Sequence, residues 1–202
     1  MGKEPTSEEI KALTWEVVSE EHLLKDRWID FRITTYRLPD GTVFSPYYSY
    51  SRRSYVVIVA SDEDGNYLCV RQFRHGIRQV TTEFPAGGIE RTDGKDYADG
   101  ADGGDGAEEA LVSAKRELLE ETGYVSDDWT HLMTVPSNAT ISDNYAHIFR
   151  AKNCRKSANL HLDETEFLNV IRLTADEIEE LIAEEQFQQA VHVMAWLLAN
   201  RQ

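Results

Sequence analysis

The sequence predicts an α+β fold in which a few helices pack against a mixed sheet, preceded by an N-terminal antiparallel β-hairpin. Short segments rich in aromatic and β-branched residues, separated by turn signals, indicate the strands. One segment near the middle of the chain shows the spacing of a helix, and a capping box and an apolar run near its end indicate two more. Mixed strands with few helices favour a sandwich of helices against a sheet, and the strand order stays open.

The composition is that of an ordinary globular protein. The chain has 202 residues, of which 41% are hydrophobic and 10% are aromatic. Its formal net charge of -15 argues against nucleic acid as a partner, because phosphate backbones are bound by clustered Lys and Arg side chains. The same acidity is compatible with carboxylates that hold divalent cations.

The N-terminus and the cysteines indicate where the protein resides. No apolar signal core is present, and no apolar run reaches the length of a membrane span, so we expect a cytoplasmic protein without a membrane partner. Cys69 and Cys154 occur singly, without a CxxC pair. We therefore expect two reduced, buried thiols.

The N-terminal region is expected to be extended over residues 13–50. Alternating aromatic and β-branched residues at 28–36, the turn signal at 38–41 and the segment 42–50 indicate a hairpin. It carries many aromatic side chains, namely Trp28, Phe31, Tyr36, Phe44, Tyr47, Tyr48 and Tyr50. Because so many aromatic side chains need a covering surface, we assign residues 1–50 to a dimerisation region and residues 51–202 to the main domain.

The main domain is expected to begin with a buried strand at 54–60, which is almost entirely apolar. A hairpin turn at 62–66 leads to a second strand at 67–74. A short strand at 81–84 follows, and residues 85–88 are expected to form a loop.

Residues 91–107 are rich in Asp and Gly, which disfavour both helices and strands. A calcium site is the alternative to a flexible loop, but Asp at every third residue lacks the ligand spacing of an EF-hand. The clearest helix follows at Glu108–Thr122, and Gly123 is a stop signal at its end.

The remaining elements alternate between strands and helices. Strands are expected at 129–135, 144–150 and 167–173. Thr174 and Glu177 have the spacing of a capping box, which indicates a helix beginning there. A last apolar helix is expected over residues 187–199.

Three carboxylates on the predicted central helix are candidates for a metal site. Glu117, Glu120 and Glu121 are spaced i, i+3 and i+4, which places them on one face. Clustered carboxylates repel one another unless a cation lies between them, and hard oxygen ligands suit Mg²⁺ or Mn²⁺. Because Mg²⁺ is usually completed by substrate phosphates, the spacing suggests phosphoryl or pyrophosphoryl chemistry. A solvated charged face is the alternative.

The residues around this helix resemble a known family. Residues 116–124, RELLEETGY, are similar to the second half of the Nudix box, GX5EX7REUXEEXGU, in which U is a large apolar residue. Glu108 stands at the first Glu of the box, but Asp102 stands where its Gly should be. Gly87, in EFPAGG, is the better match, and it lies 21 rather than six positions before Glu108. The resemblance therefore implies a box split by an insertion of 15 residues within an Asp/Gly-rich loop.

The resemblance extends over about residues 14–199 and is strongest to the ADP-ribose pyrophosphatase-like group. Residues 70–74, VRQFR, look like the segment that precedes the box in that group. The hairpin around Trp28 looks like the group's N-terminal dimerisation hairpin, and residues 163–167 look like its acidic loop. The resemblance implies a Nudix-type α/β/α sandwich that acts as a homodimer.

The resemblance also implies roles for individual residues. Glu117 and Glu121 match the main metal ligands, Glu120 shares them, and the Ala86 backbone carbonyl matches a further ligand. Arg116 matches the box Arg, which orients a catalytic Glu through an ion pair.

Three residues are implied to bind the substrate. Arg74 would face a phosphate, Glu83 would contact the nucleoside, and Trp28 would stack on the base from the partner subunit. A surface ion pair for Arg74 and plain hairpin packing for Trp28 are the alternatives.

The general base is expected on the acidic loop. Glu164 and Glu166 are the candidates, and we choose Glu166 because it adjoins the strand that would fix its position. Glu120 and Glu108 on the helix are the next candidates.

We therefore expect an Mg²⁺-dependent hydrolase, with Mn²⁺ as the alternative metal, that splits a nucleoside diphosphate linked to another group. ADP-ribose, hydrolysed to AMP and ribose 5-phosphate, is the first candidate. GDP-mannose or another sugar nucleotide or dinucleotide is the enzymatic alternative, and a catalytically inactive ligand sensor is the alternative of another class. Pro136 lies 13 residues past Gly123, which leaves the specificity open.

Overall fold

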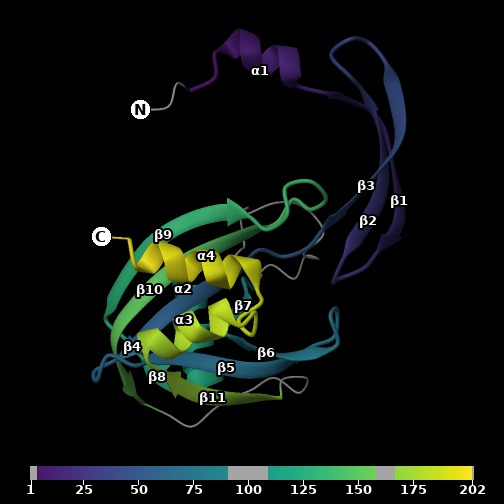
Figure 1. The fold of residues 1–202 in the computed structure, drawn as a ribbon. Coiled ribbons are helices and arrows are strands. Elements are labelled where there is room, and N and C mark those ends of the chain that lie inside the picture. Colours follow the sequence, from purple (N-terminus) through teal and green to yellow (C-terminus); the bar gives the residue numbers. More distant parts are fainter. Residues whose placement is uncertain (1–3, 91–108, 158–166, 202) are drawn as a thin grey trace. The chain divides into compact units, whose positions relative to one another are not determined.

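The computed structural model describes residues 4–90, 109–157 and 167–201 (Figure 1). These residues form two compact units. The first consists of the N-terminal residues up to Arg52 together with the segment Asn138–Asp143. The second begins at Arg53 and contains the other described residues.

The first unit is built on a three-stranded antiparallel sheet in the order β1-β2-β3. Its elements are α1 (Ser7–Leu13), β1 (Glu16–Lys25), β2 (Asp30–Arg37) and β3 (Val43–Ser51). The expected hairpin corresponds to β2 and β3, whereas β1 adds a third strand and α1 is a helix that the sequence analysis missed. Thr6 and Glu9 form a capping box that starts α1, a signal the sequence does contain.

The turn between β2 and β3 confirms the turn predicted from the sequence. Gly41 has a φ of 87°, a conformation that residues with a Cβ rarely adopt. The Asp40 carboxylate accepts the backbone N–H of Thr42 at 2.9 Å, and this hydrogen bond holds the pKa of Asp40 below its usual value. These contacts reverse the chain between the two strands.

The segment Asn138–Asp143 is attached to this sheet by polar contacts. Arg32 donates to the Asp143 carboxylate at 3.0 Å and to the Ser51 hydroxyl at 2.6 Å. The backbone N–H of Tyr50 donates to the Ile141 carbonyl at 2.9 Å. Residues that follow Pro136 therefore pack with the N-terminal unit although they are far from it in sequence.

The second unit contains an eight-stranded mixed sheet with the central order β11-β5-β4-β10-β8. β6 pairs with β5, β7 with β4 and β9 with β10. β4 and β10 run parallel, and the other pairs are antiparallel. The strands are β4 (Tyr55–Asp62), β5 (Tyr67–Arg74), β6 (Gln79–Glu83), β7 (Ala86–Gly88), β8 (Tyr124–Val125), β9 (Asp128–Pro136), β10 (Tyr145–Lys156) and β11 (Leu168–Leu173).

Two expectations about this unit were wrong. Residues 85–88 were expected to be a loop, but β7 pairs with β4, with Gly87 opposite Val56. The edge of β4 supplies hydrogen-bond partners that local propensity does not reveal. The last helix begins at Ala190 rather than at residue 187, because Phe187 turns into the core and Gln189 caps the helix with an extended backbone.

Helices cover both faces of the sheet, as the predicted sandwich requires. They are α2 (Ala110–Thr122), α3 (Ala175–Ala183) and α4 (Ala190–Ala199). Because side chains alternate along a strand, Val56 and Ile58 of β4 pack with α2, whereas Val57 and Val59 pack with α3 and α4. The prediction of an α+β fold with helices against a mixed sheet is confirmed, and α3 and α4 lie over one sheet face in Figure 1.

Both cysteines are free and buried, as predicted. Burial raises the pKa of Cys69 and of Cys154 to about 12, so both thiols stay protonated near neutral pH. Of the helices in the described ranges, none combines the length and the apolar character needed to cross a bilayer.

Candidate active site

Helix α2 carries the three carboxylates singled out from the sequence. The helix ends at Thr122, and Gly123 adopts the left-handed conformation with a φ of 74°, which confirms the predicted stop. Glu117 and Glu121 are buried at 6% and 2% exposure, and the Glu120 side chain is 36% exposed. Two buried carboxylates on one helical face are costly unless hydrogen bonds or cations compensate them.

Strand β7 lies directly against these carboxylates. The backbone N–H of Ala86 donates to Glu121 at 2.9 Å. A Cβ on Gly87 would overlap the carboxylate of Glu117, so glycine at this position lets that carboxylate lie where the structure places it. The structure thus brings together Glu117, Glu121 and Ala86, three of the four residues expected to bind metal.

Arg116 joins the exposed side of this cluster. One of its terminal nitrogens donates to Glu117 and to Glu120, both at 2.8 Å. The other donates to the Gly88 carbonyl at 3.0 Å and to the Ser113 hydroxyl at 3.2 Å. Arg116 therefore links Glu117 and Glu120 to strand β7. This position suits a residue that orients a glutamate rather than one that contacts substrate.

The donor set suits a hard divalent cation. Three carboxylates and a nearby backbone carbonyl are the oxygen ligands that Mg²⁺ and Mn²⁺ prefer. Within the part of the chain that the structure describes, no three His, Cys, Asp or Glu side chains are already arranged around a common point. Arg116 lies between Glu117 and Glu120, so these carboxylates would have to turn toward a cation.

Arg74 of β5 and Glu83 of β6 form an ion pair. The Arg74 Nε donates to the two Glu83 oxygens at 2.9 and 3.1 Å, and an Nη donates at 2.5 Å. Glu83 is fully buried and also accepts from the Thr81 hydroxyl and from the Gln189 amide. Burial by itself would raise the pKa of Glu83, but the hydrogen bonds and charge of Arg74 lower it overall.

This geometry bears on the roles expected for the pair. The Arg74 side chain is 34% exposed, and Glu83 holds its Nε and one of its terminal nitrogens. A guanidinium fixed in this way is pre-organised to bind a phosphate. Glu83 itself is 0% exposed, and its carboxylate is directed at protein groups.

Two residues of the C-terminal segment were missed by the sequence analysis. Gln189 donates to Glu83 at 3.3 Å, and the His192 Nδ1 accepts the backbone N–H of Phe84 at 3.1 Å. Burial lowers the pKa of His192 to about 4, so the imidazole is neutral near pH 7. Both residues lie on an apolar helix or next to it, and no local motif marks them.

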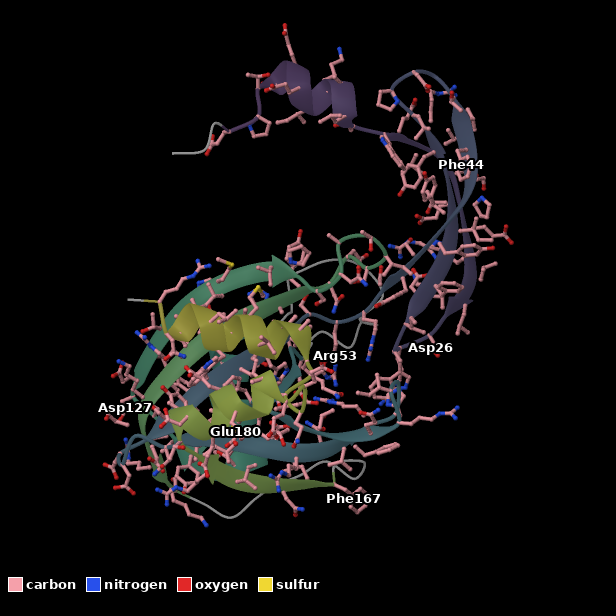
Figure 2. The ribbon with its side chains drawn as sticks, viewed as in Figure 1. Asp26, Phe44, Arg53, Asp127, Phe167 and Glu180 are labelled. Atoms are coloured by element: carbon pink, nitrogen blue, oxygen red, sulfur yellow. The ribbon has the colours of Figure 1, made fainter. Side chains whose placement is uncertain are left out.

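Trp28 belongs to the N-terminal unit. It lies in the turn between β1 and β2, where the Asp26 carboxylate accepts its backbone N–H at 2.7 Å. Trp28 is 53% exposed, and the Arg27 guanidinium lies over its ring at 4.2 Å from the centroid. Figure 2 labels Asp26 in this turn.

The acidic-loop residues Glu164 and Glu166 lie outside the described residues, as do Glu108 and the segment 91–107. The described chain resumes at Phe167, which is 85% exposed directly before β11 (Figure 2).

Comparison with known proteins agrees with this arrangement. A family model described as NUDIX domain matches residues 51–197. The methanol dehydrogenase activator of Bacillus methanolicus is 27% identical over 179 residues, which is 88% of each chain. The ADP-ribose pyrophosphatase of Bacillus subtilis (strain 168) is 25% identical over 182 residues, 90% of each chain.

A solved structure described as an ADP compounds hydrolase has the same fold. It matches with a TM-score of 0.75 and 22% identity over 93% of each chain. At this identity the likeness supports the fold alone.

Proposed function

Because this chain belongs to the Nudix family and is a pyrophosphohydrolase of that family, we propose that it hydrolyses the diphosphate bond of a nucleoside diphosphate linked to another group. ADP-ribose is the proposed substrate, and AMP and ribose 5-phosphate are the proposed products. The relative from Bacillus subtilis, an ADP-ribose pyrophosphatase that aligns with 90% of this chain, supports the choice. We further propose that the protein acts in the cytoplasm as a homodimer.

The observation that carries the proposal is the junction of α2 with β7. There the Glu121 carboxylate accepts a hydrogen bond from the Ala86 backbone, and the Glu117 carboxylate occupies the space beside Gly87. Glu117, Glu121, Glu120 and the Ala86 carbonyl would hold Mg²⁺. When bound, Mg²⁺ neutralises the diphosphate and lowers the pKa of the attacking water.

The other residues of the candidate site position the substrate and move the proton. Arg74, held by the buried Glu83, binds a phosphate oxygen. Arg116, which is anchored on the Gly88 carbonyl, orients a catalytic glutamate through its ion pairs with Glu117 and Glu120. Glu166 takes the proton of the attacking water. Trp28 of the partner subunit stacks on the nucleobase.

A hydrolysis screen tests the proposal. Purified protein with Mg²⁺ is assayed against ADP-ribose, GDP-mannose, UDP-glucose, NADH, diadenosine polyphosphates and nucleoside triphosphates. ADP-ribose is expected to give the highest kcat/KM, with AMP and ribose 5-phosphate as products. Nucleoside triphosphates as the best substrates would contradict the substrate class. A ligand sensor would bind ADP-ribose and hydrolyse none of the compounds with either Mg²⁺ or Mn²⁺.

A further inference from the structure

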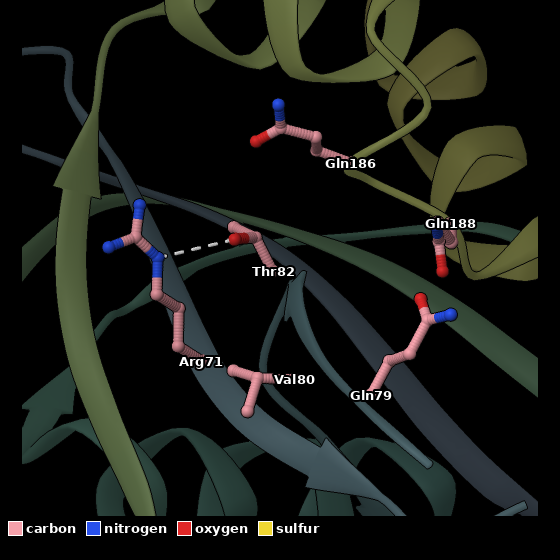
Figure 3. Close-up of a pocket in the computed structure, with 6 residues that line it drawn as sticks. All are labelled: Arg71, Gln79, Val80, Thr82, Gln186 and Gln188. Atoms are coloured by element: carbon pink, nitrogen blue, oxygen red, sulfur yellow. Dashed lines mark hydrogen bonds between the residues drawn. The ribbon is translucent and has the colours of Figure 1, made fainter. Parts of the chain in front are cut away.

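A polar hollow lies in the second unit, between the β5–β6 strands and the segment that joins α3 to α4 (Figure 3). Its volume is about 260 Å³. The residues that line it are Arg71, Gln79, Val80, Thr82, Gln186 and Gln188. All of these residues but Val80 can form hydrogen bonds through their side chains.

Arg71, Val80 and Thr82, which line this hollow, lie on the sheet face opposite α2, whereas Gln79 pairs with Arg74 and lies on the other face. Cys69 of β5 packs in the core cluster of α3 and α4, and Arg71, two residues further along the strand, shares its face. Thr82 is the cross-strand partner of Arg71. The hollow is therefore distinct from the carboxylate cluster on α2.

Arg71 gives the hollow its charge. Its Nε donates to the Thr82 hydroxyl at 3.3 Å, and no other hydrogen bond or ion pair of this side chain exists among the described residues. None of the lining residues is acidic. In a protein with a net charge of -15, the Arg71 guanidinium thus lines a hollow without a carboxylate partner among the described residues. A planar guanidinium in this state suits a phosphate oxygen pair.

The glutamine side chains supply hydrogen-bond acceptors, which Arg71 lacks. The Gln186 Nε2 donates to Glu184 at 2.9 Å, which leaves the amide oxygen of Gln186 to accept a hydrogen bond. Gln79 and Gln188 extend from two different elements toward the same space (Figure 3). Amide oxygens accept hydrogen bonds from hydroxyl groups, and a phosphate group by itself has few O–H donors.

We propose that this hollow binds a small phosphomonoester that carries hydroxyl groups, of the sugar-phosphate class. Arg71 binds the phosphate group, and the amides of Gln79, Gln186 and Gln188 bind the hydroxyl groups. At about 260 Å³ the hollow is smaller than a site for a drug-sized ligand, which favours a sugar phosphate over an intact dinucleotide. The proposed reaction would release a compound of this class, but the binding does not depend on hydrolysis.

Calorimetric titration of the full chain with ribose 5-phosphate, in buffer containing EDTA, tests the proposal. Arg71→Gln is expected to weaken binding at least tenfold, and Gln186→Leu severalfold. Arg201→Gln, at an exposed position near the C-terminus, is the matched control and leaves binding unchanged. Arg74→Gln also leaves it unchanged, because Arg74 belongs to the candidate active site. Circular dichroism checks that each variant is folded.

Three results would overturn the proposal. These are no binding by the wild-type protein, equal binding by wild type and Arg71→Gln, or loss of binding in Arg74→Gln. Titration with inorganic phosphate separates the two parts of the ligand. Equal affinity for phosphate and ribose 5-phosphate, with no effect of Gln186→Leu, would contradict the sugar part. ADP-ribose hydrolysis, measured separately, is expected to stay within about twofold of wild type in Arg71→Gln.

Discussion

Glu121 of α2 accepts a hydrogen bond of 2.9 Å from the backbone N–H of Ala86, the first residue of β7. The two residues are 35 positions apart in sequence, and the bond forms because β7 pairs with the edge of β4 beneath α2. This hydrogen bond offsets part of the cost of burying the Glu121 carboxylate, because Glu121 is only 2% exposed. The same strand places Gly87 under Glu117, so that the geometry of the candidate site depends on three residues of β7.

Gly87→Ala is expected to lower kcat at least tenfold while the midpoint of thermal unfolding changes little. The added Cβ would overlap the Glu117 carboxylate, which is the movable end of a flexible side chain, so the carboxylate shifts and the backbone does not. Gly76→Ala is the control, because no atom lies within 4 Å of a Cβ there. An unchanged kcat in Gly87→Ala would show that the position of Glu117 is unimportant.

Glu117→Gln and Glu121→Gln are each expected to lower kcat by about two orders of magnitude, a loss of about 2.7 kcal/mol in transition-state stabilisation. The amide removes the negative charge needed for a divalent cation and keeps the size of the side chain. The Mg²⁺ concentration for half-maximal activity should rise. Glu179→Gln, on the exposed side of α3, should have no effect. Near-normal turnover of either variant at saturating Mg²⁺ would rule out the proposed metal site.

Glu166→Gln is expected to lower kcat about 100-fold with little change in KM or in Mg²⁺ dependence, as expected for the loss of a general base. Cation ligands are poor bases because the bound charge lowers their pKa, which favours a separate carboxylate. Glu164→Gln is the matched control. If Glu164→Gln lowers kcat strongly and Glu166→Gln leaves it unchanged, the general base lies on this loop but is Glu164 rather than Glu166. If neither variant changes kcat, Glu120 or Glu108 becomes the candidate for the general base.

His192 is expected to make the protein less stable as the pH falls from about 6.5 to about 4. Its pKa is 6.5 when unfolded and about 4 when folded, because burial disfavours the charged imidazole, so the unfolded state binds more protons in this window. The loss approaches about 3 kcal/mol at the low end of the window. Glu83, whose folded pKa is also lowered, loses its contribution only below its ordinary value of 4.5.

Urea unfolding at several pH values measures this effect. His192→Gln retains a group that can accept the Phe84 N–H but does not titrate. The variant should lose less stability than wild type between pH 6.5 and pH 4.5. Parallel pH profiles for the two proteins would contradict a neutral, buried His192.

The β1–β3 sheet is expected to form a homodimer interface. Every residue of β1 is exposed, and the sheet presents large apolar side chains, including Val17, Leu24 and Phe44 at 55%, 54% and 49% exposure. Exposed apolar clusters of this kind mark association surfaces. Leu24→Lys should shift the mass measured by light scattering toward the monomer, whereas Ile77→Lys, at a similarly exposed position of the other unit, should not. A monomeric wild-type protein at micromolar concentration would refute the prediction.

The sequence by itself determined the features that depend on neighbours along the chain. The spacing of Glu117, Glu120 and Glu121 sets one helical face, Gly123 ends α2, and Thr174 with Glu177 forms the predicted capping box that starts α3. The apolar run at 54–60 predicted a strand buried on both faces, and β4 has that burial. These features follow from backbone geometry within a few residues.

Only the tertiary structure decided which distant residues meet. β7 is a strand because β4 offers an open edge. Gln189 reaches Glu83 across 106 positions because His192 of α4 accepts the backbone N–H of the adjacent Phe84. The neutral state of His192 likewise follows from its burial in the core, which no local pattern encodes. Contacts of this kind depend on how elements pack, because hydrophobic burial is non-directional and leaves the choice of partner to the whole core.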